Sequence, residues 1–422
     1  MTTLSRRVAI ISPLRHRDFR LLWTGLVVSL LGDGVFLVAV AWQAYKIADR
    51  PSALAGVGIA TSVPQVVLLV VGGAVSDRLS RRVVLVTADL ARAAAVGGLA
   101  VLGTMGHLHL WELWAAAFVI GAATAFAAPA FDAIVPALVP RESLLQANGL
   151  DQFLRPAALQ LLGPALGGIL LAAVGTAGAF GADALSFLFS AGCLVRLSRS
   201  VSAVVPAEGG SLWVDIKEGL GYVHSQVWLW GTFVAATFTY LLFLGPTYVL
   251  VPFIVKNSLH GSGGTLGMVL GLGGLGSLLA AAVTAQLGDR RRRPITFMYV
   301  AWTGATLLVA GYGFVTRQWQ LAALVFAVGA LEAAGTVVWA TLKQRLVPGE
   351  LLGRVSSIDW FVSTALMPLS YLLTPVVVRF LGVRATLELA GSVGAVVTFG
   401  FLFLPGMRAN DVPMARHETV DQ

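Results

Sequence analysis

The chain has 422 residues, of which 57% are hydrophobic and only 12% are charged. Soluble globular proteins carry about 25% charged residues, so this composition excludes a soluble domain and predicts an integral membrane protein. The net charge of +8 would suit a nucleic-acid partner, but the arginines stand in short clusters between apolar runs, without interleaved aromatic residues. No nucleic-acid partner is therefore expected.

Twelve apolar segments reach the length of about 20 residues that a helix needs to cross a bilayer. They cover residues 19–43, 54–75, 83–104, 111–128, 150–174, 177–197, 229–255, 264–287, 295–315, 320–341, 357–380 and 383–404. Backbone groups inside lipid must pair within their own segment, so we predict an all-α membrane protein with twelve transmembrane helices. The first run is interpreted as a retained helix, because no small-residue cleavage site follows it.

The longest connection, residues 198–228, separates six segments from the next six. It contains Trp213–Val223, whose pattern predicts a short amphipathic helix. The predicted organisation is a six-helix bundle over 1–197, a cytoplasmic connection over 198–228, a second bundle over 229–404 and a tail over 405–422.

The distribution of basic residues predicts the orientation in the membrane. Placing both termini in the cytoplasm leaves only six of the 29 lysines and arginines on the outer side. These six are Lys46, Arg50, Lys256, Arg317, Arg379 and Arg384. Because positive loops stay inside, we expect a multi-pass protein of the cell inner (plasma) membrane with both termini cytoplasmic.

The two halves repeat. Trp111–Phe153 aligns with Trp319–Phe361 without a gap, and the identical pairs include Trp111/Trp319, Phe118/Phe326, Gly121/Gly329, Glu142/Glu350 and Asp151/Asp359. Six helices separate equivalent positions, so both halves have the same orientation and the repeat is parallel. A parallel repeat predicts a substrate site near the midplane between the halves.

A charged stretch, Gly73-Ala-Val-Ser-Asp77-Arg78-Leu-Ser80-Arg81-Arg82, stands between the second and third segments. It resembles the loop between helices 2 and 3 of the major facilitator superfamily, except that the family usually has glycine at the position of Ser80. The alternative is an ordinary positive loop on an unrelated membrane protein.

The resemblance implies the major facilitator fold and a gate at this stretch. We expect Asp77 to face the start of the eleventh helix near residues 353–357, and Arg78 or Arg82 to pair with Asp132. The expected gating residues are Gly73, Asp77, Arg78, Arg81, Arg82 and Asp132.

Gly163-Pro164-Ala-Leu-Gly167-Gly168 resembles the core of the antiporter signature of drug-exporting facilitators, although Leu159 stands where a further glycine is expected. The alternative is a generic face of small residues for helix packing. The stretches Leu30–Gly34 and Pro129–Asn148 look like the macrolide-efflux and enterobactin-exporter branch. Many proton-coupled exporters carry an arginine within helix 4, and Trp111–Phe131 has none.

Gly271-Leu-Gly273-Gly274-Leu-Gly276 matches a dinucleotide-binding pattern, but it lies inside an apolar run with no strand before it. Helix packing is the expected role. No cofactor is expected, and no phosphate-binding loop is seen, so an ion gradient is the expected energy source.

Intramembrane acids are the candidate proton or substrate residues, because a charge at the bilayer centre costs at least about 2.5–3.5 kcal/mol. Asp33 and Glu332 are the deepest. We expect Asp33 to bind the transported proton, with Gly32 and Gly34 leaving room beside it and no cation between Val27 and Trp42 to neutralise it. The alternative is an acid that only hydrogen-bonds a neighbouring helix.

The other intramembrane acids are expected to be structural. Asp89 and Arg92 are three residues apart and can pair on one helix face. Asp183 and Glu388 are assigned structural or peripheral roles. All six histidines fall in predicted loops or tails, so no metal site and no catalytic centre are expected.

Together these features predict a secondary active transporter, not an enzyme, that uses alternating access. Its expected partners are the lipid bilayer, a small amphipathic cargo such as a drug, antibiotic or siderophore, and a proton, with no obligate protein partner. Lipid flipping or solute uptake on the same fold is the alternative, and a polytopic membrane enzyme is a remote one.

Overall fold

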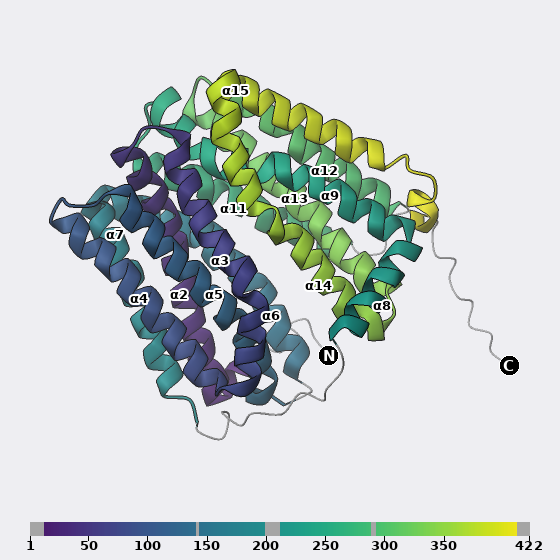
Figure 1. Cartoon of the computed structure of the whole chain (residues 1–422), viewed down its shortest axis with the longest axis horizontal. Helices are drawn as coiled ribbons and strands as arrows, with labels where there is room; N and C mark the ends of the chain where they lie inside the picture. Colours follow the sequence, from purple (N-terminus) through teal and green to yellow (C-terminus); the bar gives the residue numbers. More distant parts are fainter. Residues whose placement is uncertain (1–11, 141–142, 199–211, 288–292, 412–422) are drawn as a thin grey trace.

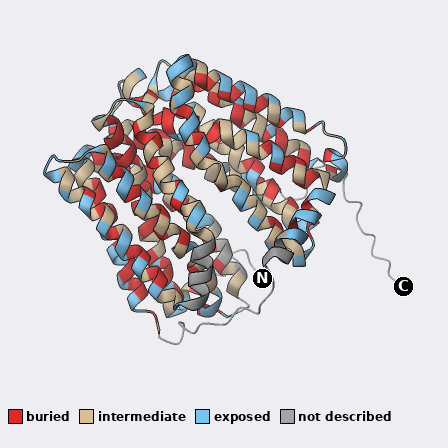
Figure 2. Cartoon of the chain, in the orientation of Figure 1, coloured by how far each residue is buried: buried red, intermediate tan, exposed pale blue. Residues whose placement is uncertain are grey.

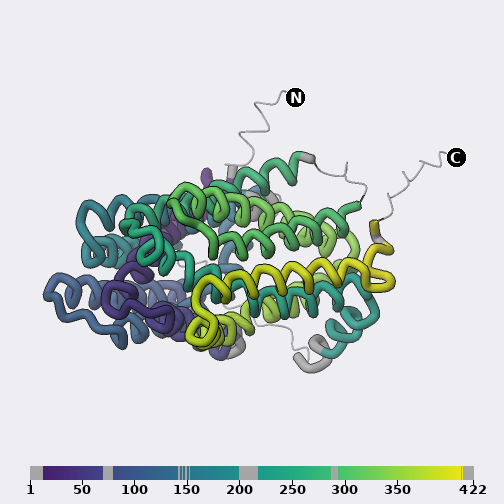
Figure 3. The backbone as a smooth tube through the Cα atoms, turned by 90° about the horizontal axis from the view of Figure 1, so that it is seen from above, coloured from purple at the N-terminus to yellow at the C-terminus, as the bar shows by residue number. Residues whose placement is uncertain are grey.

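The computed structural model describes residues 12–140, 143–198, 212–287 and 293–411, excepting the side chains of 12, 70–78, 145, 148–149, 152, 212–216, 287 and 410. This described part is helical throughout, and ten of its helical runs are long and apolar enough to cross a membrane. The helices form two bundles that lie side by side (Figure 1 and Figure 3).

The first bundle contains the helices that precede residue 199. In chain order they are η1 Ser12–Arg15, α2 Arg17–Ile47, α3 Pro51–Arg78, α4 Arg81–Thr104, α5 Leu110–Leu138, α6 Leu144–Pro156, the π-helical η3 Ala157–Leu162 and α7 Gly163–Val195. The sequence placed a charged loop at Asp77 and Arg78, but the backbone of both residues belongs to the last turn of α3. Only Leu79 and Ser80 separate α3 from α4.

The second bundle begins after the amphipathic helix α8 Leu212–Ser225, which covers the segment where the sequence predicted one. Its elements are α9 Val227–Gly245, η5 Pro246–Leu250, α10 Val251–Phe253, η6 Ile254–Ser258, α11 Gly263–Leu287, α12 Pro294–Gly311, η8 Tyr312–Phe314, α13 Gln318–Leu346, α14 Gly349–Ala365, α15 Met367–Phe401 and η9 Met407–Asp411. Residues 199–211, Asp289–Arg292 and 412–422 lie outside the described residues.

Two glycines interrupt long helical runs. Gly175 inside α7 has φ 70° and ψ −174°, and Gly382 inside α15 has φ 79° and ψ 168°. Only glycine adopts this region of backbone space without strain. Each of these residues falls between two of the segments that the sequence predicted as separate spans, so the continuous runs number ten in the described chain.

Glycines also set the close approach of helices, as a lipid-embedded bundle requires. Gly121 on α5 faces the backbone of Thr61 on α3, and Gly276 on α11 faces the backbone of Phe326 on α13. A Cβ atom at either glycine would overlap those backbone atoms. The run Gly271–Gly276 therefore serves helix packing, as predicted, within α11.

The two bundles are joined at the end that carries Asp49 and Lys256, which we call the joined end. Buried apolar residues of both bundles form one core there, with Tyr45 and Leu250 among its fully buried members. Separate cores fill the other half of each bundle, around Phe19 and around Tyr299. The bundles diverge towards α6 and α8 (Figure 1), and buried residues gather within each bundle and at the joined end (Figure 2).

Candidate functional site

Asp33 lies midway along α2, and the two glycines beside it, Gly32 and Gly34, face α7. A Cβ atom at Gly32 would overlap Ser186 and Asp183 of α7, and one at Gly34 would lie 2.7 Å from the Cα atom of Gly163. The expectation that these glycines leave room for water or cargo is therefore wrong. They allow α7 to pack directly against α2, and this packing brings a second acid beside the first.

That second acid is Asp183, which is fully buried on α7. The Ser186 hydroxyl lies 2.8 Å from its backbone carbonyl oxygen and 3.3 Å from its Oδ1 atom. The Oδ2 atom is also buried and has no hydrogen-bond partner among the described residues. The carboxyl groups of Asp33 and Asp183 interact electrostatically across the α2–α7 contact.

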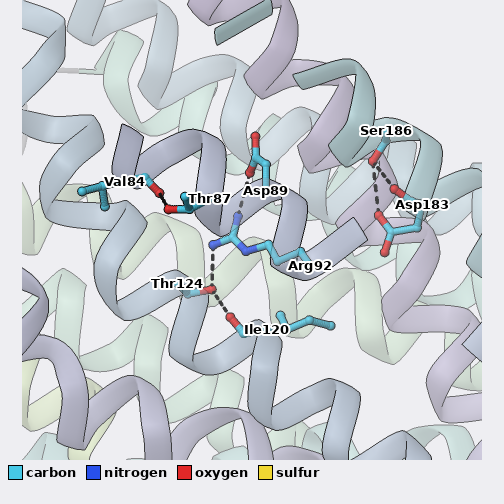
Figure 4. Close-up of polar contacts among 8 residues, drawn as sticks. All are labelled: Val84, Thr87, Asp89, Arg92, Ile120, Thr124, Asp183 and Ser186. Carbon is cyan, nitrogen blue, oxygen red and sulfur yellow. Dashed lines mark hydrogen bonds and ion pairs between the residues drawn. The ribbon is translucent and has the colours of Figure 1, made fainter. Parts of the chain in front are cut away.

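A third acid, Asp89 on α4, is paired with Arg92 one turn later, as predicted. Arg92 Nη1 lies 3.5 Å from Asp89 Oδ1, and Arg92 Nη2 donates to Thr124 Oγ1 of α5 at 3.0 Å (Figure 4). The guanidinium also lies over the ring of Phe187 on α7, 5.5 Å from its centroid. The predicted fourth span corresponds to α5, which has no arginine between Trp111 and Phe131. Arg92 of the neighbouring helix α4 contacts this span instead.

Together these side chains form what we call the acid cluster: Asp33, Asp89, Arg92 and Asp183. Asp33 lies within electrostatic range of Arg92 and Asp89 on α4 and of Arg155 on α6. The stretch Val27–Trp42 contains no cation, but both of these arginines come from other helices. If all three acids were ionised, Arg92 alone would leave two negative charges unbalanced in a low-dielectric interior, because Arg155 is already paired with Asp151.

Glu332 lies in the second bundle, far along the chain from the acid cluster. Its helix α13, with α9, α12 and α15, lines a partly open cavity of about 50 Å³. The cavity is lined by threonines and aromatic residues, including Tyr240, Tyr299 and Trp302. Among the described residues, no hydrogen bond or ion pair reaches the Glu332 carboxylate. A water-sized space needs about 10–15 Å³, so the cavity has room for more than one water molecule or a small polar group.

Comparison with known proteins places the chain in a family. The profile of a family described as transmembrane secretion effectors, within the major facilitator superfamily, matches residues 8–420. The chain belongs to this family.

Curated relatives agree with that membership. The macrolide efflux protein A of Streptococcus pyogenes is 22% identical over 384 residues, covering 89% of this chain and 92% of the relative. The enterobactin exporter EntS of Citrobacter koseri is 26% identical over 345 residues, 81% of each chain. An MFS-type transporter of Bacillus subtilis, YkuC, is 25% identical over 362 residues, 82% of each chain. The chain is therefore a multi-pass membrane transporter with an efflux or transport role, and not an enzyme.

Solved structures agree on the fold. A bacterial homologue of the iron transporter ferroportin in an inward-facing state superposes with a TM-score of 0.67 at 17% identity, over 91% of this chain and 98% of that one. A bacterial homologue of the lysosomal transporter Spinster, also inward-facing, gives a TM-score of 0.68 at 13% identity, over 94% of this chain and 98% of that one.

The antiporter-like motif of this facilitator lies where α7 contacts α2 of its own bundle and α11 of the second bundle. Gly163 and Pro164 contact Gly34 of α2, and a Cβ atom at Gly167 would lie 3.0 Å from the Cα atom of Val35. A Cβ atom at Gly168 would lie 3.0 Å from the Cα atom of Gly267, on α11 of the second bundle. The motif is thus a packing surface for two helices at once, as the small-residue alternative expected.

The gating stretch of this facilitator is described only in part. Arg81 Nη1 donates to the Ala133 carbonyl oxygen at 2.8 Å. Arg82 donates to the carbonyl oxygens of Leu197, at 2.9 Å, and Val195, where cations favour a helix carboxyl end. In this conformation Arg82 therefore caps α7, and Asp132 on α5 is exposed. The packing of Gly73 and the side chains of Asp77 and Arg78 are not among the described parts of the structure.

The sequence did not predict two sets of polar contacts in this facilitator. Lys343 and Trp339 of α13 both donate to Asp359 of α14, with the indole nitrogen 3.2 Å from a carboxylate oxygen. Asp49 meets Lys256 at the joined end. The first group has an i, i+4 signal on α13, but nothing in the sequence shows which acid completes it. The second joins residues that are distant in the chain.

Proposed function

We propose that the chain is a proton-coupled exporter of amphipathic small molecules that works by alternating access. The observation that carries this proposal is the acid cluster, which gathers three carboxyl groups and one arginine inside membrane-spanning helices. Buried carboxyl groups with too few counter-charges take up protons readily, and cargo or conformational change can shift that balance. The names of the curated efflux relatives support the outward direction and an amphipathic cargo.

The proposal includes twelve spans in two parallel repeats. It places the protein in the cell inner (plasma) membrane, with both termini in the cytoplasm. The runs Phe153–Val195 and Gly349–Phe401 have 43 and 53 residues. A straight helix of 43 residues would be about 65 Å long, twice the thickness of the hydrocarbon core. Reversal at Gly175 and Gly382 supports two crossings in each run. We retain the bundles at 1–197 and 229–404, the connection at 198–228 and the tail at 405–422.

Alternating access is supported by the arrangement of the bundles, which are bound together at the joined end and diverge at the other (Figure 1). With the termini inside, this is an inward-facing conformation. The gate at Asp77 then belongs to the opposite, outward-facing conformation. In that state it would hold the diverging ends together.

The test is accumulation of a compound panel in cells with and without the protein. Dissipating the proton gradient with an uncoupler should abolish the difference between the two cell lines. Depleting ATP while the gradient is kept should leave most of the difference. Export that follows ATP and ignores the gradient would refute the proposal.

A further inference from the structure

The cavity at Glu332 is lined by residues that have no part in the proton coupling proposed for the acid cluster. Its walls come only from helices of the second bundle, and four of its residues are aromatic: Tyr240, Phe243, Tyr299 and Trp302. The cavity also contains Glu332, the only acid in its lining. A carboxylate beside several ring faces is an environment that attracts a cation.

The position of Trp302 follows from a glycine. A Cβ atom at Gly335 would overlap the indole of Trp302, so only glycine lets the indole pack against α13 at this point. Gly335 stands three residues after Glu332, and residues at this spacing share a helix face. Because Gly335 has no side chain, the indole of Trp302 can pack on the face of α13 that also carries Glu332. Trp302 also packs against Tyr299 and Trp339, with ring centroids 6.2 Å and 6.4 Å away.

Five hydroxyl groups of the cavity already make hydrogen bonds within the protein. Thr232 lies 2.9 Å from the Tyr299 hydroxyl, and Thr239 lies 2.8 Å from Thr398. Thr306 donates to the Trp302 carbonyl oxygen at 2.8 Å. A hard metal ion needs six or more oxygen ligands, which this lining of rings and committed hydroxyls does not offer. An organic cation needs only one counter-charge and ring faces.

We infer that the Glu332 cavity binds the cationic head group of a basic amphipathic cargo, an organic ammonium. The Glu332 carboxylate supplies the counter-charge, and Trp302 with Tyr240 supplies the ring faces. A volume of about 50 Å³ suits a head group and not a whole amphiphile, so the apolar remainder of the cargo lies outside the cavity. This inference rests on the proposed function in taking the bound cation to be the cargo.

The test is equilibrium binding to the full chain in lipid nanodiscs, without any gradient. Isothermal titration calorimetry would compare benzyltrimethylammonium with uncharged benzyl alcohol and anionic phenylacetate, with empty nanodiscs subtracted. The wild type should bind the cation more tightly than both other probes. Glu332→Gln should weaken binding of the cation roughly tenfold or more and leave the other probes unchanged.

The matched control is Glu388→Gln, which removes an acid of α15 that is paired on the surface with Arg384. It should leave all affinities unchanged. If Glu332→Gln does not fold, Trp302→Leu provides a second variant, which should weaken cation binding in the same direction. Equal binding of the three probes by the wild type, or full cation affinity in Glu332→Gln, would overturn the inference.

The two proposals fail in different ways. Cation-selective binding without gradient-driven export would count against the proposed function and leave the Glu332 site standing. Gradient-driven export by a protein that binds the three probes equally would remove the Glu332 site and leave the proposed function standing.

Discussion

Lys256 of the second bundle donates a hydrogen bond to Asp49 of the first, with 2.9 Å between Nζ and Oδ1. The same ammonium group donates to the Tyr45 carbonyl oxygen, and Asn257 donates to Asp49 Oδ1 at 2.8 Å. The Tyr45 hydroxyl completes the set by donating to the Val249 carbonyl oxygen. These contacts cross between the bundles, so they must break whenever the joined end opens.

Asp49→Asn should therefore populate the conformation in which the joined end is open. The measurement is a distance distribution between spin labels at His107 and Thr316, one in each bundle, in a Cys193→Ser background. The variant should show a larger fraction of long distances than the wild type. Arg384→Ala is the control, because its ion pair with Glu388 lies within α15. An unchanged distribution would show that these contacts do not hold the end closed.

The same contact predicts a pH dependence. Hydrogen bonds from Asn257 and Lys256 lower the pKa of the Asp49 carboxyl. The contact is then at full strength above the ordinary aspartate pKa of about 3.9 and is lost only as pH falls through the lowered value. The label distances should not change between pH 8 and pH 5 on account of Asp49. A midpoint near pH 6 that Asp49→Asn abolishes would contradict this.

Asp33→Asn should stop gradient-driven export while cargo binding survives. Asparagine keeps the shape and most hydrogen bonds of the side chain but cannot exchange a proton. The export rate should fall roughly tenfold or more, within the range seen when a proton-transferring group is removed. Cargo affinity, measured by calorimetry in nanodiscs, should stay at the wild-type value. Concentrative export by this variant at the wild-type rate would exclude Asp33 as the proton site.

Gly34→Ala should destabilise the protein, because its new Cβ atom would lie 2.7 Å from the Cα atom of Gly163 and 2.9 Å from the Leu159 carbonyl oxygen. Backbone atoms cannot rotate away, so overpacking of about 1–3 kcal/mol is expected. Gly98→Ala is the matched control on α4, where nothing lies within 4 Å, and it should stabilise by about 0.5–1 kcal/mol. Thermal unfolding in detergent compares the two, and equal midpoints would contradict the packing argument.

Asp77→Asn tests the gate that the family resemblance implies. Without the carboxylate, the outward-facing conformation should lose its contact with the start of α14, a contribution of up to about 1–2 kcal/mol. Transport should then fall severely while the amount of protein in the membrane stays normal. Compound accumulation in cells and membrane immunoblots measure the two quantities. Transport at the wild-type rate would show that Asp77 holds no gate.

The positions of the helices could be predicted because lipid requires long apolar runs, and charged residues fall between them. Asp33 could be selected for the same reason, since a carboxyl group in such a run is rare. Its neighbours could not be predicted. Asp183 and Arg92 come from α7 and α4, and only the packing of α2 against α7 through Gly32 and Gly34 brings the acids together.

The two reversals could be placed from sequence only as gaps between predicted spans. Arg379 and Arg384 mark the turn at Gly382, whereas Gly175 has no charged residue beside it. What defines them is a backbone conformation, which the sequence does not display. The pairing of Asp49 with Lys256 shows the same limit, because it depends on how the bundles meet.

The reversals at Gly175 and Gly382 have a practical consequence for mapping the topology of this transporter. Each turn uses a single residue and no loop, so an epitope or protease site inserted there has to break a helix. Loss of function after such an insertion would report on folding and not on sidedness. The connection around Gly106, where the chain leaves α4 through a turn before His109, offers several exposed residues and is the better place for a reporter.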